Sequence, residues 1–210
     1  SAHCGAYGNR NFYAFFTDWF GSTQKVQYTF AQKYYKNNQW KTGLLTGETK
    51  CVDANNNVVN LSNNGDYSCS QDFEKGTLFW NTNVKNGVKI ENGEVFLEKA
   101  KAEQFKKLTV AQRKDGIYKK WIEELNTVGN LKTVTTFEKN KNYRVLQGEK
   151  GVVLGNDSKG YITYKQKAYE AYVRLYKDLG EPVKGWGYNT TSKIEFYEFK
   201  NGYIVGNNSK

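Results

Sequence analysis

The sequence contains no methionine, one proline and one histidine among its 210 residues. A single proline leaves no proline-rich linker between domains. The only histidine, His3, lies near the N-terminus, so a Ser-His-Asp or Cys-His catalytic centre would have to be built around that terminal residue. Three cysteines and one histidine do not have the spacing of a structural zinc site, and neither a P-loop nor a dinucleotide-binding motif is present. We therefore expect a protein that is not an enzyme and that needs no metal or cofactor.

Long apolar runs are also missing, because no stretch approaches the roughly 18 residues of a membrane-spanning helix. The sequence therefore predicts no transmembrane segment. Hydrophobic residues make up 38% of the chain, yet 16% of all residues are aromatic, with 16 Tyr, 12 Phe and 5 Trp. Each such ring buries a large area, so a core built on aromatic side chains is feasible in a chain of this length.

The formal net charge of +10 and the pI near 9.3 suit anionic partners, such as nucleic acid, acidic glycans, teichoic acids or phospholipid head groups. The basic residues are scattered, however, and acidic residues interrupt them. The chain has no zinc-finger spacing and no RNP-like motif, so nucleic acid is not the expected partner. A solvated, lysine-rich surface without a specific anionic partner remains the alternative.

Two of the three cysteines are expected to form a disulfide, which leaves the third unpaired within the chain. Cys51 and Cys69 flank a segment rich in Asn, Gly and Ser, and we predict a disulfide between them, with two separate reduced thiols as the alternative. Cys4 is then left free, intermolecular or modified. The start of the chain lacks an initiator methionine, which favours a mature protein whose secretion signal has been removed. A secreted or cell-surface location is consistent with a disulfide.

Two nearly identical nonamers indicate an internal repeat. GVVLGNDSK occupies residues 151–159 and GYIVGNNSK occupies residues 202–210, which is 51 positions later. The same shift aligns two amphipathic segments, residues 115–128 and 166–179, which we predict to be helices followed by the glycines Gly129 and Gly180. Each helix is expected to be followed by a loop and two strands, near residues 143–146 and 152–154 in one copy and near residues 193–198 and 203–206 in the other.

A third, divergent copy is predicted at the front of the chain. Residues 26–37 are expected to be its helix, Gly47 aligns with Gly180, and residues 71–80 (QDFEKGTLFW) are expected to form its hairpin. The segment from Phe12 to Phe20 (FYAFFTDWF) is interpreted as a helix that caps the array, with an exposed anchor for a partner as the alternative. Residues 94–108 are expected to be a basic amphipathic helix or a linker.

These patterns predict an α+β fold of about three helix–loop–β-hairpin repeats around a shared core. The repeats would span about residues 24–93, 109–159 and 160–210, and residues 1–23 would form an aromatic N-terminal cap.

QDFEKGTLFW, the following GVKIENGEVF (residues 87–96) and DLGEP (residues 178–182) resemble the signatures of LGFP repeats, which are modules of secreted bacterial proteins. The sequence departs from that pattern where VGNL (residues 128–131) lacks the proline and where Trp80 is replaced by Gly155 and Gly206 in the later copies. The resemblance implies a non-catalytic module that tethers proteins to the cell wall or its glycans.

Aromatic rings that stack on sugars are the candidates for such a site. The predicted glycan-binding residues are Trp80, Trp186, Tyr188, Tyr203 and Lys184. A place in the core is the alternative for each ring. Trp186 is the ring that we most expect to be exposed, because glycines flank it.

The preferred function is binding of cell-wall or extracellular polysaccharide, and the alternative is a self-assembling subunit of a filament, sheath or surface layer. Self-association would use the segment from Phe12 to Phe20 or Cys4. A pair of catalytic carboxylates is not indicated, and Asp53 and Asp66 are the nearest candidates for one.

Overall fold

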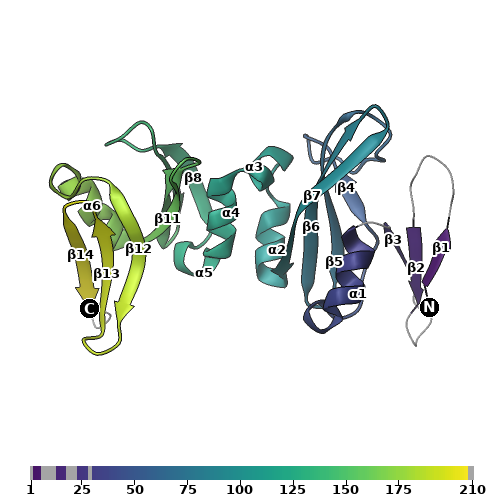
Figure 1. Ribbon diagram of the computed structural model, residues 1–210, viewed down its shortest axis with the longest axis horizontal. Coiled ribbons are helices and arrows are strands. Elements are labelled where there is room, and N and C mark those ends of the chain that lie inside the picture. The colour runs from purple at the N-terminus through teal and green to yellow at the C-terminus, as the bar shows by residue number, and fades with distance from the viewer. Residues whose placement is uncertain (1, 6–12, 18–22, 28–29, 208–210) are drawn as a thin grey trace. The chain divides into compact units, whose positions relative to one another are not determined.

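The computed structural model describes residues 2–5, 13–17, 23–27 and 30–207 (Figure 1). The chain divides into two compact units, which we call unit 1 (Ser1–Lys114) and unit 2 (Asp115–Lys210). Both units combine helices with antiparallel sheets, so the predicted α+β class is confirmed. Among the described residues, no helix is long and apolar enough to cross a bilayer.

Sheet A is the first sheet of unit 1, and its three strands follow the order β1-β2-β3. They are β1 (Ala2–Gly5), β2 (Tyr13–Thr17) and β3 (Thr23–Gln27). The predicted helix from Phe12 to Phe20 is therefore wrong for the residues that can be compared, because β2 pairs with a strand on each side. Aromatic side chains favour extended backbone, and four of the nine residues in this segment are phenylalanine. Phe12 and residues 18–20 lie outside the described residues.

Cys4 lies in β1, opposite Ala14 of β2. The predicted boundary between a cap of residues 1–23 and the rest of the chain falls at Thr23, the first residue of β3. Sheet A therefore continues across this boundary.

Sheet B is the larger sheet of unit 1, and its four antiparallel strands follow the order β4-β5-β6-β7. The elements around it are α1 (Phe30–Thr42), β4 (Lys50–Val52), β5 (Gly65–Phe73), β6 (Gly76–Lys85), β7 (Val88–Glu98), α2 (Lys99–Lys106) and α3 (Val110–Lys114). The predicted helices at residues 26–37 and 94–108 begin later than expected, at Phe30 and Lys99. Strands occupy the first residues of both predicted segments, since β3 extends to Gln27 and β7 to Glu98.

Helices cover both faces of sheet B because β6 is apolar at consecutive positions. Leu78 and Trp80 pack on one side with Ala31 of α1. Phe79 points to the other side, where its ring lies 4.8 Å from the ring of Phe105 of α2, edge to face. All five side chains are at most 3% exposed.

Unit 2 contains two antiparallel sheets, sheet C with the order β11-β10-β9-β8 and sheet D with the order β12-β13-β14. The elements of unit 2 are α4 (Gly116–Glu123), α5 (Leu125–Val128), β8 (Leu131–Thr136), β9 (Arg144–Gly148), β10 (Gly151–Asn156), β11 (Gly160–Lys165), α6 (Gln166–Leu179), β12 (Pro182–Asn189), β13 (Ile194–Phe199) and β14 (Gly202–Asn207). The helices α4 and α5 pack on sheet C, whereas α6 contacts both sheets.

The core of unit 2 surrounds Tyr172, a fully buried residue of α6. Its ring stacks on Phe199 of sheet D at 4.3 Å, and it also stacks on Phe137 at 6.0 Å and on Tyr164 of sheet C at 6.1 Å. One helix therefore joins the two sheets through a single aromatic cluster.

The helices predicted at residues 115–128 and 166–179 are confirmed, the first with a break at Glu124. The four predicted strands of unit 2 overlap β9, β10, β13 and β14, and two of them were placed one residue too early, at Tyr143 and Lys193. The segments expected to be loops contain further strands, β8 and β12, and β11 was not predicted. Each hairpin of the expected unit is thus part of a larger sheet.

The ends of α5 and α6 use the same hydrogen bonds 51 positions apart. Trp121 donates its indole N–H to the carbonyl oxygen of Gly129 over 2.9 Å, and Tyr172 donates its hydroxyl to that of Gly180 over 2.8 Å. The two glycines have φ angles of 77° and 74°, which side chains with a Cβ rarely adopt. Both helices therefore end on a glycine whose carbonyl oxygen accepts from a buried aromatic side chain eight residues earlier, in α4 for Gly129 and in α6 itself for Gly180.

In unit 1 the corresponding glycine is Gly43, with φ 69°, and not Gly47 as the alignment predicted. The amide of Lys75 donates to the carbonyl oxygen of Thr42, the last residue of α1, over 3.0 Å. The equivalent donor–acceptor pairs in unit 2 are Lys150–Val128 and Asn201–Leu179. The alignment was misplaced because Gly47 serves another purpose: its carbonyl oxygen accepts from the buried side chain of Gln71.

Candidate functional site

Two adjoining hollows of about 480 and 770 Å³ lie in unit 2 and share Thr127, Lys165 and Tyr197. We call them together the unit 2 groove. The smaller hollow is bordered by Trp186 and Gly185 of β12 and by Tyr161, Ile162 and Thr163 of β11. The larger one continues along the start of α6 to the end of β14.

Trp186 presents an exposed ring at the smaller hollow, with 51% of its surface accessible. Its indole stacks on Tyr188 with the ring centres 6.0 Å apart and an interplanar angle of 12°. Packing favours glycine on both sides of Trp186. A Cβ on Gly185 would lie 3.0 Å from Ile162, and one on Gly187 would lie 2.4 Å from the ring of Phe196. The two exposed rings therefore form a flat aromatic surface beside the groove.

Charged side chains of both signs line the groove. Lys165 forms an ion pair with Glu195 over 2.5 Å, and Glu195 is only 7% exposed. Lys120 and Glu124 of the smaller hollow form a second ion pair, over 3.6 Å. Lysine and carboxylate groups close to an exposed indole can bind the hydroxyl groups of a sugar while its apolar face stacks on the ring.

A network of hydrogen bonds holds Tyr161 at the rim of the groove. Arg144 donates to both carboxylate oxygens of Asp115, over 2.9 and 2.6 Å, and to the hydroxyl of Tyr161 over 3.0 Å. Asp115 also caps α4, because it accepts the backbone N–H of Ile117. The hydrogen bonds from Arg144 lower the pKa of Asp115, and they raise the pKa of Arg144 in return.

The variant Asp115→Asn should lower the free energy of unfolding of unit 2 by about 1–2 kcal/mol at neutral pH, because a charged hydrogen-bonded pair is lost at a partly exposed position while the cap is retained. The pKa of Asp115 is lower in the folded state, so its contribution is complete above about pH 4 and is lost as the pH falls through the folded pKa. Thermal unfolding from pH 7 to pH 2 should therefore show a smaller acid-induced loss for Asp115→Asn than for the parent chain. Asp178→Asn, at an exposed position on α6, is the control, and equal curves for the two variants would contradict the assignment.

Trp80 is not available to a ligand, so its prediction as a glycan-binding residue is wrong. It is 1% exposed and lies opposite Cys69 in the pairing of β5 with β6. Its ring belongs to the core between sheet B and α1. The physical reason is its position in a central strand that helices cover on both faces.

Tyr203 is 60% exposed but does not lie with Trp186. In sheet D, Trp186 is opposite Tyr197, whereas Tyr203 is opposite Glu198, the next residue along the same strand. Because neighbouring residues of a strand point to opposite faces, Tyr203 and Trp186 lie on different sides of the sheet. Lys184 is exposed in β12 between two shifts of the strand register.

The two candidate carboxylates of unit 1 are engaged in structural contacts, Asp53 with the backbone and Asp66 with two side chains. Asp53 accepts the backbone N–H groups of Asn55 and Asn57 in a turn. Asp66 accepts from the side chain of Asn83 over 2.7 Å and lies 3.3 Å from the ammonium group of Lys114, and these contacts lower its pKa. No group of three His, Cys, Asp or Glu side chains suited to a metal ion occurs in the described part of the chain.

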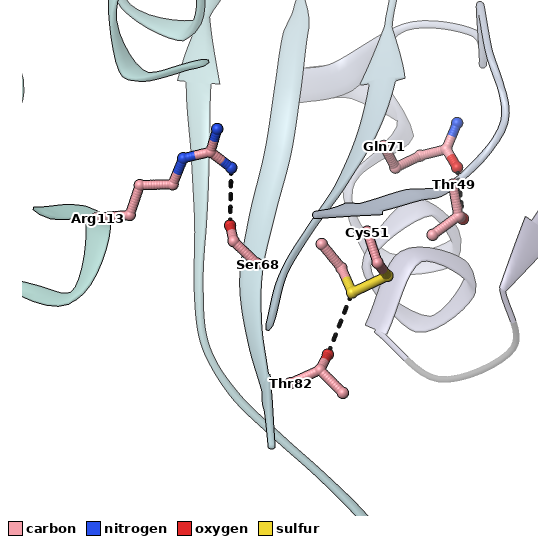
Figure 2. The surroundings of a disulfide bond; sticks show 7 residues. Thr49, Cys51, Ser68, Gln71, Thr82 and Arg113 are labelled. Carbon is pink, nitrogen blue, oxygen red and sulfur yellow. Dashed lines mark hydrogen bonds between the residues drawn. A yellow bond between two sulfur atoms is a disulfide. The ribbon is translucent and has the colours of Figure 1, made fainter. Parts of the chain in front are cut away.

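The predicted disulfide between Cys51 and Cys69 is confirmed (Figure 2). The two cysteines are direct partners in the pairing of β4 with β5, and both are buried. Figure 2 also shows Thr82 beside the bond, 3.3 Å from the Cys69 sulfur. Gln71, fully buried, accepts from the Thr49 hydroxyl over 2.8 Å. The segment before β5 is thus attached to sheet B by a covalent bond and by a buried amide.

The groove residues Tyr161, Ile162 and Lys165 were missed because β11 itself was missed. The sequence contains a usable signal, since GYITYK at residues 160–165 alternates in the way that strands do. No local sequence pattern marks Lys120 of α4 and Glu195 of β13 as groove residues, because only the packing of α6 between two sheets brings these elements together.

A scan against protein-family models and a search of the curated proteins give no match to this chain.

Proposed function

We propose that the chain is a non-catalytic, secreted or cell-surface protein that binds polysaccharide through the unit 2 groove. The observation that carries the proposal is the exposed Trp186 ring, stacked on Tyr188 at the edge of a hollow of about 480 Å³. A flat aromatic surface beside a polar groove suits a sugar chain, whose rings have one apolar and several polar faces.

The charge of the groove favours an acidic polysaccharide. Lysines outnumber glutamates among its lining residues, which include Lys120, Lys150, Lys165 and Lys167 beside Glu124 and Glu195. The net charge of +10 acts in the same direction at longer range. Uronic acids or phosphodiester-linked wall polymers combine anionic groups with sugar rings and are the ligands that this site fits best.

The finer architecture that we propose is an array of about three LGFP-like repeats. The glycine-terminated helices ending at Gly43, Gly129 and Gly180, each followed by an antiparallel sheet, support it. The recurring backbone hydrogen bonds after each helix support it further. The secreted location rests on the disulfide, since such bonds persist in oxidising compartments.

The variant Trp186→Ala should weaken retention on wall polysaccharide by about tenfold or more, because a central aromatic contact of a binding site is removed. Retention is measured by affinity electrophoresis or by pull-down with isolated cell-wall glycan at low salt. Trp40→Ala is the matched control, since Trp40 is 77% exposed on α1 in unit 1. Folded parent protein that is not retained on any acidic or neutral polysaccharide, or equal loss in both variants, would contradict the proposal.

A further inference from the structure

Sheet D turns an apolar face away from α6, and we call this the outer face of sheet D. Its exposed or half-buried apolar residues are Ile194, Phe196, Tyr203 and Val205, of which Tyr203 and Val205 are 60% and 64% exposed. The residues that alternate with them, Tyr197 and Ile204, face α6 and belong to the core. Within the described part of the chain, the sheet therefore has one covered face and one uncovered apolar face.

The same positions in sheet C are buried. The residues 51 positions earlier are Tyr143, Val145, Val152 and Leu154, with exposures of 4%, 5%, 0% and 2%. The strand register is equivalent, because Leu154 is opposite Val145 as Val205 is opposite Phe196. The four residues of sheet C are buried in the cluster that α6 completes. In sheet C, this face is thus covered by an amphipathic helix, α6.

Helices also cover the corresponding face of sheet B. Phe79, 2% exposed, contacts the ring of Phe105 of α2. Arg113 of α3 lies over the Phe79 ring at 5.5 Å and donates to Ser68 of β5 over 2.9 Å (Figure 2). Both other helix-covered sheets of the chain therefore use this face to hold the helix that follows them.

One polar position on this face contacts the covering helix in both cases. In sheet B, Asp72 forms an ion pair with Lys106 of α2 over 3.1 Å. In sheet C, Gln147 donates to Gln166, the first residue of α6, over 2.6 Å. The equivalent residue of sheet D is Glu198, which accepts from the hydroxyl of its strand neighbour Tyr203 over 3.4 Å. Glu198 is half-buried and lies opposite Lys184 of β12, and its carboxylate can accept a further hydrogen bond from a cation on whatever covers this face.

The free edge of sheet D also indicates a site for a strand and a helix. The central strands β6 and β10 pair with β7 and β11, and these two strands lead directly into α2 and α6. Sheet D has the order β12-β13-β14, so among the described residues no strand pairs with the far edge of β14. An open edge beside an uncovered apolar face can accept a strand and a helix together.

We propose that the outer face of sheet D binds a protein partner that presents a strand followed directly by an amphipathic helix. The strand pairs with the far edge of β14. The apolar stripe of the helix covers the four exposed side chains, and a lysine or arginine of the helix pairs with Glu198. The exposed apolar side chains lie on the face of sheet D opposite Trp186, whereas Ile204, Val205 and Gly206 at the end of β14 also line the larger hollow of the groove.

The probe for this surface is a fluorescein-labelled peptide of residues 160–180, the strand–helix segment that covers sheet C. Its binding to the full chain is measured by fluorescence anisotropy. We expect saturable binding that Tyr203→Asp weakens by about tenfold or more, since an anchoring apolar contact becomes an unpaired charge and Tyr203 does not line the groove. Val88→Asp, at a valine that is 51% exposed in unit 1, is the matched control and should bind as the parent chain does.

A charge exchange tests the role of Glu198. Glu198→Lys should weaken binding of the peptide, and a peptide with glutamate in place of its lysines should restore it. Equal binding by Tyr203→Asp, Val88→Asp and the parent chain would overturn the proposal, and so would the absence of saturable binding. A concentration-dependent dimer that Tyr203→Asp abolishes, without peptide binding, would also overturn it, because a second copy of the chain would then occupy the face.

Discussion

Replacing Tyr172 by alanine is expected to lower the free energy of unfolding of unit 2 by about 3–5 kcal/mol. Tyr172 is fully buried, and its ring lies within 6.1 Å of the rings of Phe137, Tyr164 and Phe199. Removing the ring leaves a cavity between sheet C and sheet D, because α6 is held to both sheets and cannot follow the lost volume. The loss is of the order of the whole stability of a small unit.

Two further variants separate the contributions of the ring and the hydroxyl. Tyr172→Phe should cost only about 1 kcal/mol, because it loses the hydrogen bond to Gly180 and keeps the packing. Tyr203→Ala is the control for tyrosine removal at an exposed position, and it should change stability by less than about 0.5 kcal/mol. Denaturant unfolding monitored by circular dichroism measures all three. A cost below about 1 kcal/mol for Tyr172→Ala would mean that this aromatic cluster does not hold the two sheets together.

Loss of the disulfide should destabilise unit 1 by about 3 kcal/mol, since the bond closes a loop between residues 18 positions apart. The variant Cys51→Ala/Cys69→Ala is preferable to reduction, because it leaves Cys4 unchanged. Both cysteines are buried against Trp80, so near-ultraviolet circular dichroism of the tryptophans should change together with the unfolding midpoint.

Cys4→Ala is the matched single-cysteine control and should unfold as the parent chain does. Alkylation of the native protein without reductant, followed by mass spectrometry, gives an independent reading. Cys51 and Cys69 are expected to remain unmodified. Modification of Cys51 and Cys69 under these conditions would contradict the disulfide.

The helices of unit 2 could be predicted from the sequence because their apolar residues recur at helical spacing and a glycine follows the last of them. Tyr118, Trp121, Leu125 and Val128 recur at helical spacing, and Gly129 follows them. The pairing of Cys51 with Cys69 was likewise accessible, since the segment between them contains few core-forming residues. Patterns of this kind can be recognised from the sequence because the residues that define each element lie close together in the chain.

Other features depended on contacts that no local pattern encodes. Phe79 and Trp80 are both buried, because different helices cover the two faces of β6, and alternation alone cannot distinguish such a core ring from a ligand-binding one. Gly47 has the residue type of a helix-terminating glycine but lies beyond the end of α1. At the front of the chain, the aromatic composition of residues 13–17 favours a strand, and their pairing with β1 and β3 determines the outcome.

The candidate site was predicted in part. Trp186 and Tyr188 were proposed from their glycine-flanked aromatic sequence, and both border or adjoin the groove. Tyr203 was assigned to the same site because it lies in the neighbouring hairpin, but the alternation of strand residues places it on the other face of sheet D. Its 60% exposure instead points to the partner surface inferred above.

The most direct test of polysaccharide binding at the groove is an NMR titration that follows the indole N–H resonances of the five tryptophans, assigned by single replacement with phenylalanine. Acidic wall polysaccharide should shift the Trp186 resonance in a saturable manner. The resonances of the buried Trp80 and Trp121 and of the exposed Trp40 should stay in place. A titration that leaves Trp186 unchanged while the polysaccharide binds, or that moves Trp40 equally, would contradict binding at the groove.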